Sequence, residues 1–168
     1  MNKKFQIQTG GKEKQIEIKV AAISNLKDIQ ELNHQLCIKE VKEFDQTINE
    51  NYPIQKDGEE YFKERIENGY ALVADVDNKI VGYLIGGISE ASDYRNISKI
   101  AEAENMYVLE EYRSFGIGGK LFQEFIDWCK AKGIERMKVV VSSKNTKAID
   151  FYKKEGFEDY DITLEKTL

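Results

Sequence analysis

The sequence predicts a mixed α+β fold, in which some strands are adjacent along the chain and others alternate with helices. Three strand-like runs follow one another at 70–75, 80–89 and 100–108, separated only by turn-like or polar residues. Beyond them, segments with helical spacing alternate with short apolar runs, which is typical of a sheet covered by helices. The 168 residues are enough for one full core, so we expect a single domain over residues 1–168.

The N-terminal half predicts one core strand and two helices. The core strand covers residues 16–22, and the alternation at 5–8 predicts either an extra strand or a loose tail over residues 1–15, with a turn at Gly10-Gly11. Ser24 or Asn25 caps the first helix. Its apolar residues lie on one stripe: Leu26, Ile29, Leu32, Leu36 and Val41. The second helix covers 59–68 and ends at Gly69.

The middle of the chain predicts an antiparallel hairpin. Its strands cover 70–75 and 80–89, and the turn between them is Asp77-Asn78-Lys79. A polar loop over 89–99 then leads to the strand 100–108. Three consecutive strands of this kind favour a sheet that is largely antiparallel in its centre.

The C-terminal part predicts helices and strands in alternation. A helix over 118–132 ends at Gly133, and a continuously apolar run at 137–141 is typical of a buried central strand. A helix capped by Asn145 ends at Gly156, and the last strand covers 157–164. The stretch from 100 to 141 predicts a right-handed crossover between two parallel strands.

Composition excludes several classes of protein. The net charge of −5 argues against a general nucleic-acid binder, and no apolar run is long enough to cross a membrane. The N-terminus has no apolar core typical of a signal peptide, so we expect a cytoplasmic protein. Cys37 and Cys129 fall in helical segments and are expected to be buried free thiols. His34 is the single histidine, which rules out a histidine-based metal cluster, and we expect no metal.

Three glycines, Gly116, Gly118 and Gly119, stand between the strand 100–108 and the helix that follows. Uncovered backbone N–H groups and the positive end of a helix form a ready site for phosphate. A Walker A loop is excluded because Leu121 follows Lys120, and a dinucleotide fingerprint is excluded because position 121 is not glycine. The alternative is a helix start whose glycines serve only close packing.

Together these segments resemble the Gcn5-related N-acetyltransferase (GNAT) superfamily. Arg113-x-x-Gly116-x-Gly118 resembles the acetyl-CoA signature of that family, and the segment from Asn145 through Phe151-Tyr152 to Gly156-Phe157 resembles its second conserved segment. The hairpin that starts at Ala71 also matches. The resemblance covers about residues 70–160 and implies a mixed, mostly antiparallel sheet of six to seven strands with about four helices. Ser114 and Glu110 depart from the usual pattern.

The resemblance implies acetyl-CoA as the co-substrate. Backbone amides of the glycine stretch are expected to hold the pyrophosphate, and the strand before it is expected to pair with the pantetheine arm. Arg113 adds charge and fixes the turn, whereas Lys120 either reaches a phosphate or is solvated. Asn145 touches the cofactor, caps its helix, or does both. The expected cofactor-binding residues are Met106, Tyr107, Val108, Arg113, Ser114, Phe115, Gly116, Ile117, Gly118, Gly119, Lys120 and Asn145.

The implied chemistry needs a general base and a general acid. Glu102 and Glu104 lie two apart on one strand and therefore on one sheet face, which Met106 and Val108 share unless a bulge intervenes. Glu104 is the preferred base and Glu102 the second choice; otherwise they bind a cationic substrate or are solvated. Tyr152 matches the general acid of the family, and its alternative is a core tyrosine.

The resulting hypothesis is an N-acetyltransferase that acts by direct attack of a primary amine of a small molecule or peptide. Neither cysteine matches a nucleophile position, which argues against an acyl-enzyme. One alternative is a non-catalytic acyl-CoA sensor, and another is an acetyltransferase of protein N-termini or lysines. Homodimers are common in the superfamily, so a homodimer is among the expected partners.

Overall fold

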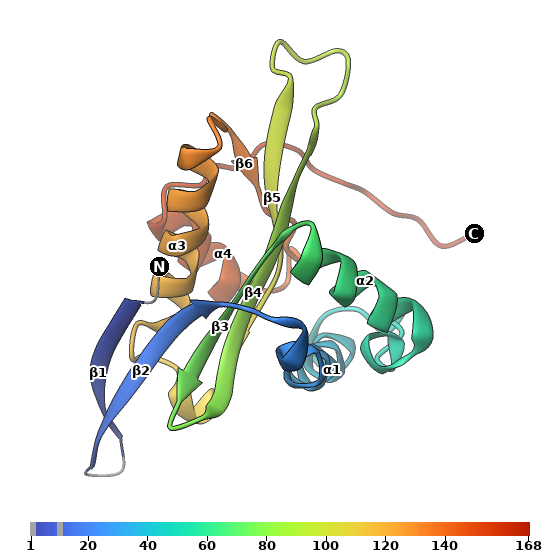
Figure 1. The fold of residues 1–168 in the computed structure, drawn as a ribbon. Coiled ribbons are helices and arrows are strands. Elements are labelled where there is room, and N and C mark those ends of the chain that lie inside the picture. Colours follow the sequence, from blue (N-terminus) through green and yellow to red (C-terminus); the bar gives the residue numbers. More distant parts are fainter. Residues whose placement is uncertain (1–2, 10–11) are drawn as a thin grey trace.

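The computed structural model describes residues 3–9 and 12–168, and in these ranges a six-stranded sheet lies between two layers of helices (Figure 1). The strands are β1 (Lys3–Thr9), β2 (Lys12–Val20), β3 (Tyr70–Val76), β4 (Lys79–Glu90), β5 (Lys99–Val108) and β6 (Met137–Lys138). The helices are α1 (Leu26–Glu43), α2 (Lys56–Glu67), α3 (Ile117–Ala131) and α4 (Thr146–Lys154), with short 3-10 turns at Ile23–Asn25, Tyr52–Ile54 and Glu110–Tyr112. The predicted mixed α+β fold is confirmed.

The strands follow one another across the sheet in chain order, β1-β2-β3-β4-β5-β6. Neighbours from β1 to β5 are antiparallel, and β5 and β6 are parallel, joined by α3. The parallel crossover predicted for this part of the chain is therefore confirmed. The connection between β5 and α3, with its glycines, follows Val108 and therefore lies at the end of β5 opposite to the residues that pair with β6.

The N-terminal segment forms a hairpin strand and not a loose tail. β1 pairs with β2 from Lys3 opposite Ile18 to Thr9 opposite Lys12. Ile16 and Ile18 are buried on the same face because successive side chains of a strand alternate between faces. The turn predicted at Gly10-Gly11 lies outside the described residues.

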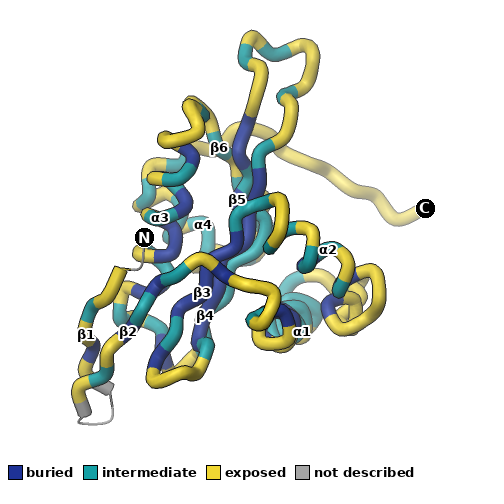
Figure 2. The backbone as a smooth tube through the Cα atoms, in the orientation of Figure 1, coloured by how far each residue is buried: buried dark blue, intermediate teal, exposed yellow. Residues whose placement is uncertain are grey.

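The two helical layers bury the two faces of the sheet separately. On one face, α3 inserts three fully buried side chains, Leu121, Phe122 and Phe125. On the other face, α1 and α2 contribute Ile29, Leu32 and Phe62 against β3 and β4. Figure 2 shows the buried backbone concentrated in the central strands and on the inner side of α3. The apolar residues recur every three to four positions in the helices and every second position in the strands. This spacing places them on the faces that form the two cores.

The hairpin of β3 and β4 has the turn that the sequence predicts. Asp77 and Asn78 both have positive φ, 53° and 65°. Two consecutive residues in the left-handed region define a type I′ turn, whose twist matches that of the flanking strands. Asp and Asn tolerate this region better than most residues, because their short side chains hydrogen-bond locally.

Two predictions at the C-terminal end are wrong. The run at 137–141 forms only the two-residue β6, and Val140 is 79% exposed, so this is not a buried central strand. Among the described strands, β6 is the last of the sheet and pairs with β5 alone, which explains why this run is exposed. The strand predicted over 157–164 does not form, because no neighbouring strand of the described chain takes up its alternating pattern.

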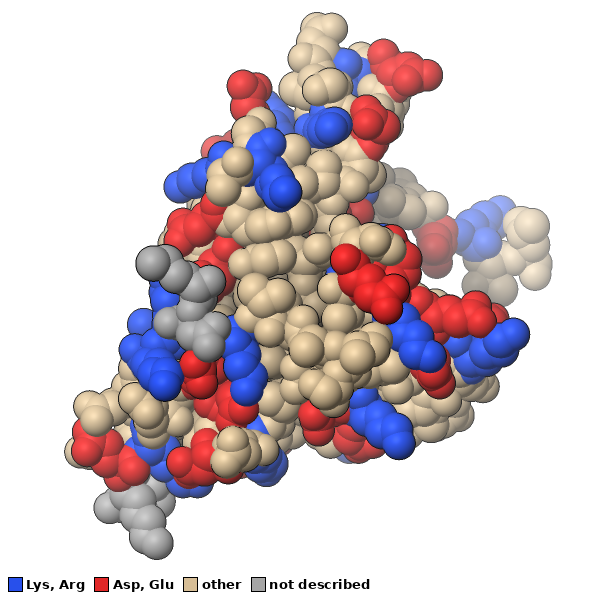
Figure 3. Space-filling view, in the orientation of Figure 1, with Lys and Arg blue, Asp and Glu red and all other residues tan. Residues whose placement is uncertain are grey.

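In Figure 3, acidic and basic side chains are intermixed around the periphery of the face, and its centre is largely uncharged. No helix of the described residues is both long and apolar enough to cross a membrane. Within the same described ranges, His, Cys, Asp and Glu side chains do not gather into a group of three that could hold a metal ion.

Candidate active site

The glycine stretch forms a loop that ends on an uncapped helix. After the 3-10 turn at Glu110–Tyr112, the backbone enters the left-handed region at Ser114 (φ 66°) and again at Gly116 (φ 78°), which is the N-cap of α3. No side chain of the described residues caps this helix. The first N–H groups of a helix lack intrahelical acceptors, and they lie at the positive end of the helix dipole.

The glycines at the start of α3 are not required by the protein's own packing. A Cβ added at Gly118 would meet only the Met106 Cε atom at 4.0 Å, and one added at Gly119 would meet the Glu155 Oε1 atom at 3.9 Å. Glycine inside a helix is about 1 kcal/mol less favourable than alanine. Two glycines kept at such a cost indicate close approach by a ligand, and the exposed amides around them suit a phosphate group.

Ser114 carries backbone strain that glycine would release. A non-glycine residue in the left-handed region costs about 1–2 kcal/mol, partly offset by the flexibility of glycine in the unfolded chain. We expect Ser114→Gly to raise the free energy of unfolding by about 0.5–1 kcal/mol, measured by urea denaturation. In the control Gly116→Ala the new Cβ meets no atom within 4 Å, so strain alone acts, and stability is expected to fall by about 1 kcal/mol. A loss of stability in Ser114→Gly would contradict this account.

Arg113 folds back onto β5. Its Nε donates a hydrogen bond to the carbonyl oxygen of Val108 at 2.8 Å, and its guanidinium lies 5.1 Å from the ring centroid of Tyr107. These contacts close the turn between β5 and α3. They keep a positive charge beside the loop at the same time.

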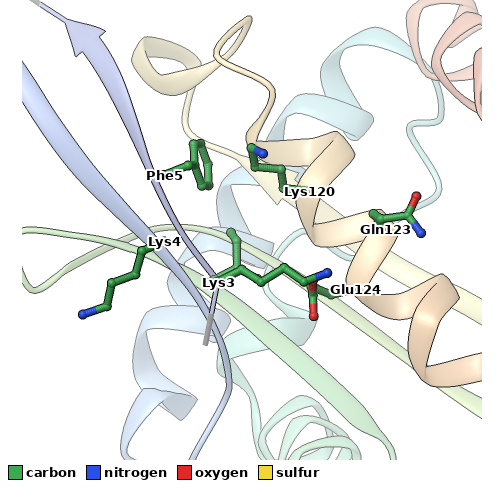
Figure 4. Close-up of a pocket in the computed structure, with 7 residues that line it drawn as sticks. Lys3, Lys4, Phe5, Lys120, Gln123 and Glu124 are labelled. Carbon is green, nitrogen blue, oxygen red and sulfur yellow. The ribbon is translucent and has the colours of Figure 1, made fainter. Parts of the chain in front are cut away.

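Lys120 points toward the N-terminal hairpin. Its ammonium lies 4.5 Å from the ring centroid of Phe5, beside a hollow of about 290 Å³ between β1 and α3 (Figure 4). Lys3, Lys4 and Glu124 also line this hollow. Lys120 is exposed and its side chain lies over an aromatic ring, so solvation fits and the contact with a phosphate stays a prediction.

The edge of β5 that faces β6 is paired over a short length only. The two strands pair at Ala101 opposite Met137 and at Glu102 opposite Lys138. From residue 103 to residue 108, β5 has no neighbour on this side among the described strands, so the backbone of Met106, Tyr107 and Val108 borders an open strand edge. Such an edge can accept an extended partner by backbone hydrogen bonds.

A bulge in β5 places the side chains of Met106 and Val108 on a different sheet face from that of Glu104. Ile85 pairs with Asn105 and Gly86 with Ala103, which leaves Glu104 as the extra residue. Because an extra residue reverses the alternation, Met106 and Val108 pack with α3, whereas Glu104 and Asn105 face α1 and α2. The bulge is the exception that the sequence analysis allowed for, and with it Met106 and Val108 do not share the face of Glu102 and Glu104.

Glu104 is held by two donors from α2. Its Oε2 accepts a hydrogen bond from the Tyr61 hydroxyl at 2.5 Å and from the Arg65 Nε at 2.8 Å. The side chain of Glu104 is 17% exposed, so the pair is shielded but still open to solvent. Burial, together with the bond to Glu104, raises the pKa of Tyr61 above its ordinary value. Tyr61 therefore stays protonated and remains a hydrogen-bond donor to the Glu104 carboxylate.

A chain of hydrogen bonds extends from Glu104 into the core. Asn105 donates to the Tyr61 hydroxyl at 2.9 Å, and Asn33 donates to the side-chain oxygen of Asn105 at 3.3 Å and to the Tyr83 hydroxyl at 2.6 Å. Asn33 is buried. The network fixes the bulge against α1 and α2 and thereby orients Glu104.

Sequence reasoning named Glu104 but missed Arg65, Asn33, Asn105 and Tyr83 as members of this network. A usable signal existed for Asn33, which interrupts the apolar stripe of α1 next to Leu32. A buried amide needs partners, so it predicts a polar site opposite the helix. The other three residues carry no local signal, because they meet only when the helices dock on the sheet.

Glu102 lies outside this network. Its Oε2 forms an ion pair with the Lys138 ammonium of β6 at 2.9 Å. The pair connects the two strands at the position where their pairing ends. Of the two glutamates, Glu104 is the one that hydrogen-bonds to helix α2.

Tyr152 lies on α4 in an aromatic cluster. Its ring centroid is 5.7 Å from that of Phe122 on α3 and 5.7 Å from that of Phe157. Burial raises the pKa of its hydroxyl, and the nearby Glu40 carboxylate of α1 raises it further. Tyr152 therefore stays protonated at neutral pH.

Asn145 caps α4 as predicted. Its side-chain oxygen accepts a hydrogen bond from the backbone N–H of Ala148 at 3.2 Å. Phe115 and Ile117, which flank the first glycine, pack into the core beside α3 and anchor the loop at both ends. The remaining members of the loop, Ser114 and Gly116, are exposed.

Comparison with known proteins identifies the class. The model of the acetyltransferase (GNAT) family matches residues 35–157, and the chain therefore belongs to that family. An uncharacterized N-acetyltransferase of Methanocaldococcus jannaschii is 34% identical over 107 residues, which are 61% of this chain and 46% of that protein. The chain thus spans about half the length of this relative. An N-alpha-acetyltransferase of Sulfurisphaera tokodaii is 31% identical over 122 residues, or 68% of this chain and 70% of that protein.

Solved structures share the same fold. An aminoglycoside N-acetyltransferase, AAC(6')-Iy, in complex with CoA superimposes with a TM-score of 0.72 at 17% identity, over 92% of this chain and 95% of that chain. A predicted acetyltransferase from Clostridium acetobutylicum with acetyl-CoA superimposes with a TM-score of 0.73 at 20% identity, over 90% and 96% of the two chains. At these identities the likeness concerns the fold alone.

Proposed function

We propose that this chain transfers the acetyl group of acetyl-CoA to a primary amine by direct attack. One observation carries the proposal: the uncapped start of α3 keeps two glycines that no protein atom requires, beside the open edge of β5. Membership of the GNAT family supports it, as does the fold shared with a neighbour that was solved with acetyl-CoA.

The loop and β5 bind the co-substrate. Backbone amides of residues 114–119 bind the pyrophosphate, and Arg113 stabilises the loop through the Val108 carbonyl. The backbone of Met106 to Val108 pairs with the extended pantetheine arm, and a backbone N–H there polarises the thioester carbonyl. When bound, acetyl-CoA supplies the activated acetyl group and a thiol leaving group.

Two side chains move the protons. Glu104, directly or through one water, accepts a proton from the attacking amine, whose nitrogen forms the new bond to the carbonyl carbon. The C–S bond breaks, and the Tyr152 hydroxyl donates its proton to the departing sulfur. Tyr61 and Arg65 position Glu104 without taking part in the transfer.

An acyl-enzyme on cysteine is disfavoured. Burial and the neighbouring Glu40 carboxylate raise the pKa of the Cys37 thiol to about 11, and burial raises that of Cys129 to about 11. The thiolate is the nucleophilic form, and little of it exists at neutral pH at these pKa values. Direct attack by the amine therefore fits the site better.

The acceptor that fits best is the α-amine of a peptide. An α-amine has a pKa of about 7.7–8.0, so about one tenth is neutral at pH 7, against less than about one in a thousand for a lysine side chain. One oxygen of Glu104 already accepts two hydrogen bonds, which makes the carboxylate a weaker base. An acceptor amine that is partly neutral at pH 7 suits such a base. The name of the Sulfurisphaera relative, an N-alpha-acetyltransferase, supports this choice.

The release of free CoA thiol tests the proposal. We expect turnover on peptides with a free N-terminus to exceed by at least about tenfold that on N-terminally blocked lysine peptides, polyamines and aminoglycosides. Glu104→Gln keeps the hydrogen bonds of its neighbours in part and is expected to lower kcat by about a hundredfold. The control Glu102→Gln removes only the ion pair with Lys138 and should keep most activity.

Two outcomes would contradict the proposal. Tight binding of acetyl-CoA without turnover on any acceptor of the panel would favour a non-catalytic acyl-CoA sensor. Preference for lysine or polyamine acceptors would overturn the α-amine assignment and leave acetyl transfer itself intact.

A further inference from the structure

A hollow of about 300 Å³ lies at the end of β5 opposite to the glycine loop. It forms where the connection between β4 and β5 meets the start of β6 and the C-terminal segment, and the residues that line it are Tyr94, Arg95, Asn96, Ile97, Arg136 and Tyr160. Figure 1 shows the connection at the top of the view, with the C-terminal segment passing below it. None of these residues takes part in the proposed acetyl transfer.

Two positive charges line the hollow. The chain has four arginines, of which Arg65 and Arg113 lie in the candidate active site and the other two line the hollow. Among the described residues, no carboxylate forms an ion pair with Arg95 or Arg136, and none lines the hollow. The Arg95 guanidinium lies 4.6 Å from the ring centroid of Tyr160, and stacking of this kind leaves the N–H groups at its edge free to donate. Two guanidinium groups without an acidic partner favour an anionic ligand.

The hollow lies on the same face of the sheet as Glu104. Met137 packs into the core that α3 covers, so its neighbours Arg136 and Lys138 point to the other face. On that face Lys138 forms an ion pair with Glu102, which stands two residues before Glu104 on β5. This ion pair therefore lies between Glu104 and the hollow, on one continuous face of the sheet.

The distance from Glu104 to the hollow corresponds to a few residues of extended peptide. The Ala101 N–H of β5 donates a hydrogen bond to the Arg136 carbonyl oxygen at 3.0 Å. Ala101 stands three positions before Glu104, which is about 10 Å along a strand. A peptide whose α-amine lies at Glu104 and which runs along this face therefore reaches the hollow with about its fourth to sixth residues.

We propose that Arg95 and Arg136 bind acidic side chains at about the fourth to sixth positions of the acceptor peptide. The assignment rests on the proposed function, because that function places the peptide α-amine at Glu104. Each guanidinium forms charge-assisted hydrogen bonds with a carboxylate, and the Tyr94 and Tyr160 rings pack against the methylene groups of the peptide side chains. The preferred acceptors are then peptides and proteins with an acidic N-terminal segment.

Steady-state kinetics on three matched peptides tests the hollow. The peptides differ only at positions four to six, which are all glutamate in the first, all glutamine in the second and all lysine in the third. We expect the KM of the glutamate peptide to be about tenfold lower than that of the glutamine peptide at equal kcat, because the reacting amine and its neighbours are the same. Sodium chloride at about 0.5 M should reduce this difference, since it screens partly exposed ion pairs.

Reversal of the charge in the hollow gives a result that a loss of folding cannot imitate. Arg95→Glu combined with Arg136→Glu is expected to bind the lysine peptide better than the glutamate peptide and to keep its kcat on the glutamine peptide. The control Lys99→Glu changes a basic residue at the start of β5 that does not line the hollow, so its preference for the glutamate peptide should remain.

Calorimetric titration of the same peptides in the presence of CoA separates this assignment from the proposed function. Preferential binding of the glutamate peptide without turnover would contradict acetyl transfer and keep the hollow as a peptide site. Equal dissociation constants for the glutamate and glutamine peptides would overturn the hollow as a binding site, even if both peptides are acetylated. A preference for glutamate that persists in the double variant would overturn it as well, because the acidic residues would then bind elsewhere.

Discussion

Tyr152→Phe is expected to lower kcat by about two to four orders of magnitude while acetyl-CoA still binds with an unchanged dissociation constant. The phenol supplies the proton that the departing sulfur needs, and a positioned general acid contributes about 10²–10⁴-fold. The ring itself packs against Phe122 and Phe157, so phenylalanine preserves the aromatic cluster. Thiol release gives kcat, and calorimetric titration with acetyl-CoA gives the dissociation constant.

The pH profile gives an independent measure of the same hydroxyl. Only the protonated phenol can act as an acid, and burial together with Glu40 raises its pKa. The loss of kcat on the alkaline side should therefore begin above the pH at which an ordinary tyrosine ionises. Glu40→Gln removes a negative charge, which lowers the pKa of Tyr152, so the alkaline limb should move to lower pH.

Tyr70→Phe is the matched control for this pair of measurements. Tyr70 also lies in an aromatic cluster, stacked on Trp128 with centroids 4.6 Å apart, but away from the glycine loop. Its loss of a hydroxyl should leave kcat and its pH profile unchanged. If Tyr152→Phe were as active as the wild type, the hydroxyl would not be the general acid, and Tyr152 would serve only as a core residue.

The parts of the site that were predictable are those encoded by neighbouring residues. The glycine loop lies between a strand and a helix, and the cap at Asn145 depends on residues three positions apart, so both can be read along the chain. The bulge at Glu104 was not predictable, because it arises from the pairing of β4 with β5. The contact of Arg65 with Glu104 likewise depends on the docking of α2 on the sheet.

The two incorrect strand predictions have a common physical cause. Alternating or continuous apolar residues indicate that a segment can form a strand. They do not indicate whether a neighbouring strand is present to pair with it. Residues 137–141 end at the sheet edge after one short pairing, and residues 157–164 pair with none of the described strands.

Gly118→Asp is expected to stabilise the protein and to weaken acetyl-CoA binding by at least about a hundredfold. Gly118 is the second residue of α3, where a carboxylate interacts favourably with the helix dipole by about 0.3–1 kcal/mol and glycine is a poor helix former. The same carboxylate would face the phosphates and occupy the amides that bind them. A hundredfold loss corresponds to about 2.7 kcal/mol, which is the scale of one or two charge-assisted hydrogen bonds.

Gly118→Ala separates the effect of volume from that of charge. Its Cβ meets only the Met106 Cε atom at 4.0 Å, so the fold gains about 0.5–1 kcal/mol while the close approach of phosphate is hindered, and binding should weaken by about tenfold. Gly133→Ala gives the opposite pattern. Its φ of 70° makes alanine unfavourable by about 1 kcal/mol, and binding should not change. If the acetyl-CoA affinity of Gly118→Asp were unaltered, the phosphates would have to bind elsewhere. A carboxylate at this position would repel any phosphate bound by these amides.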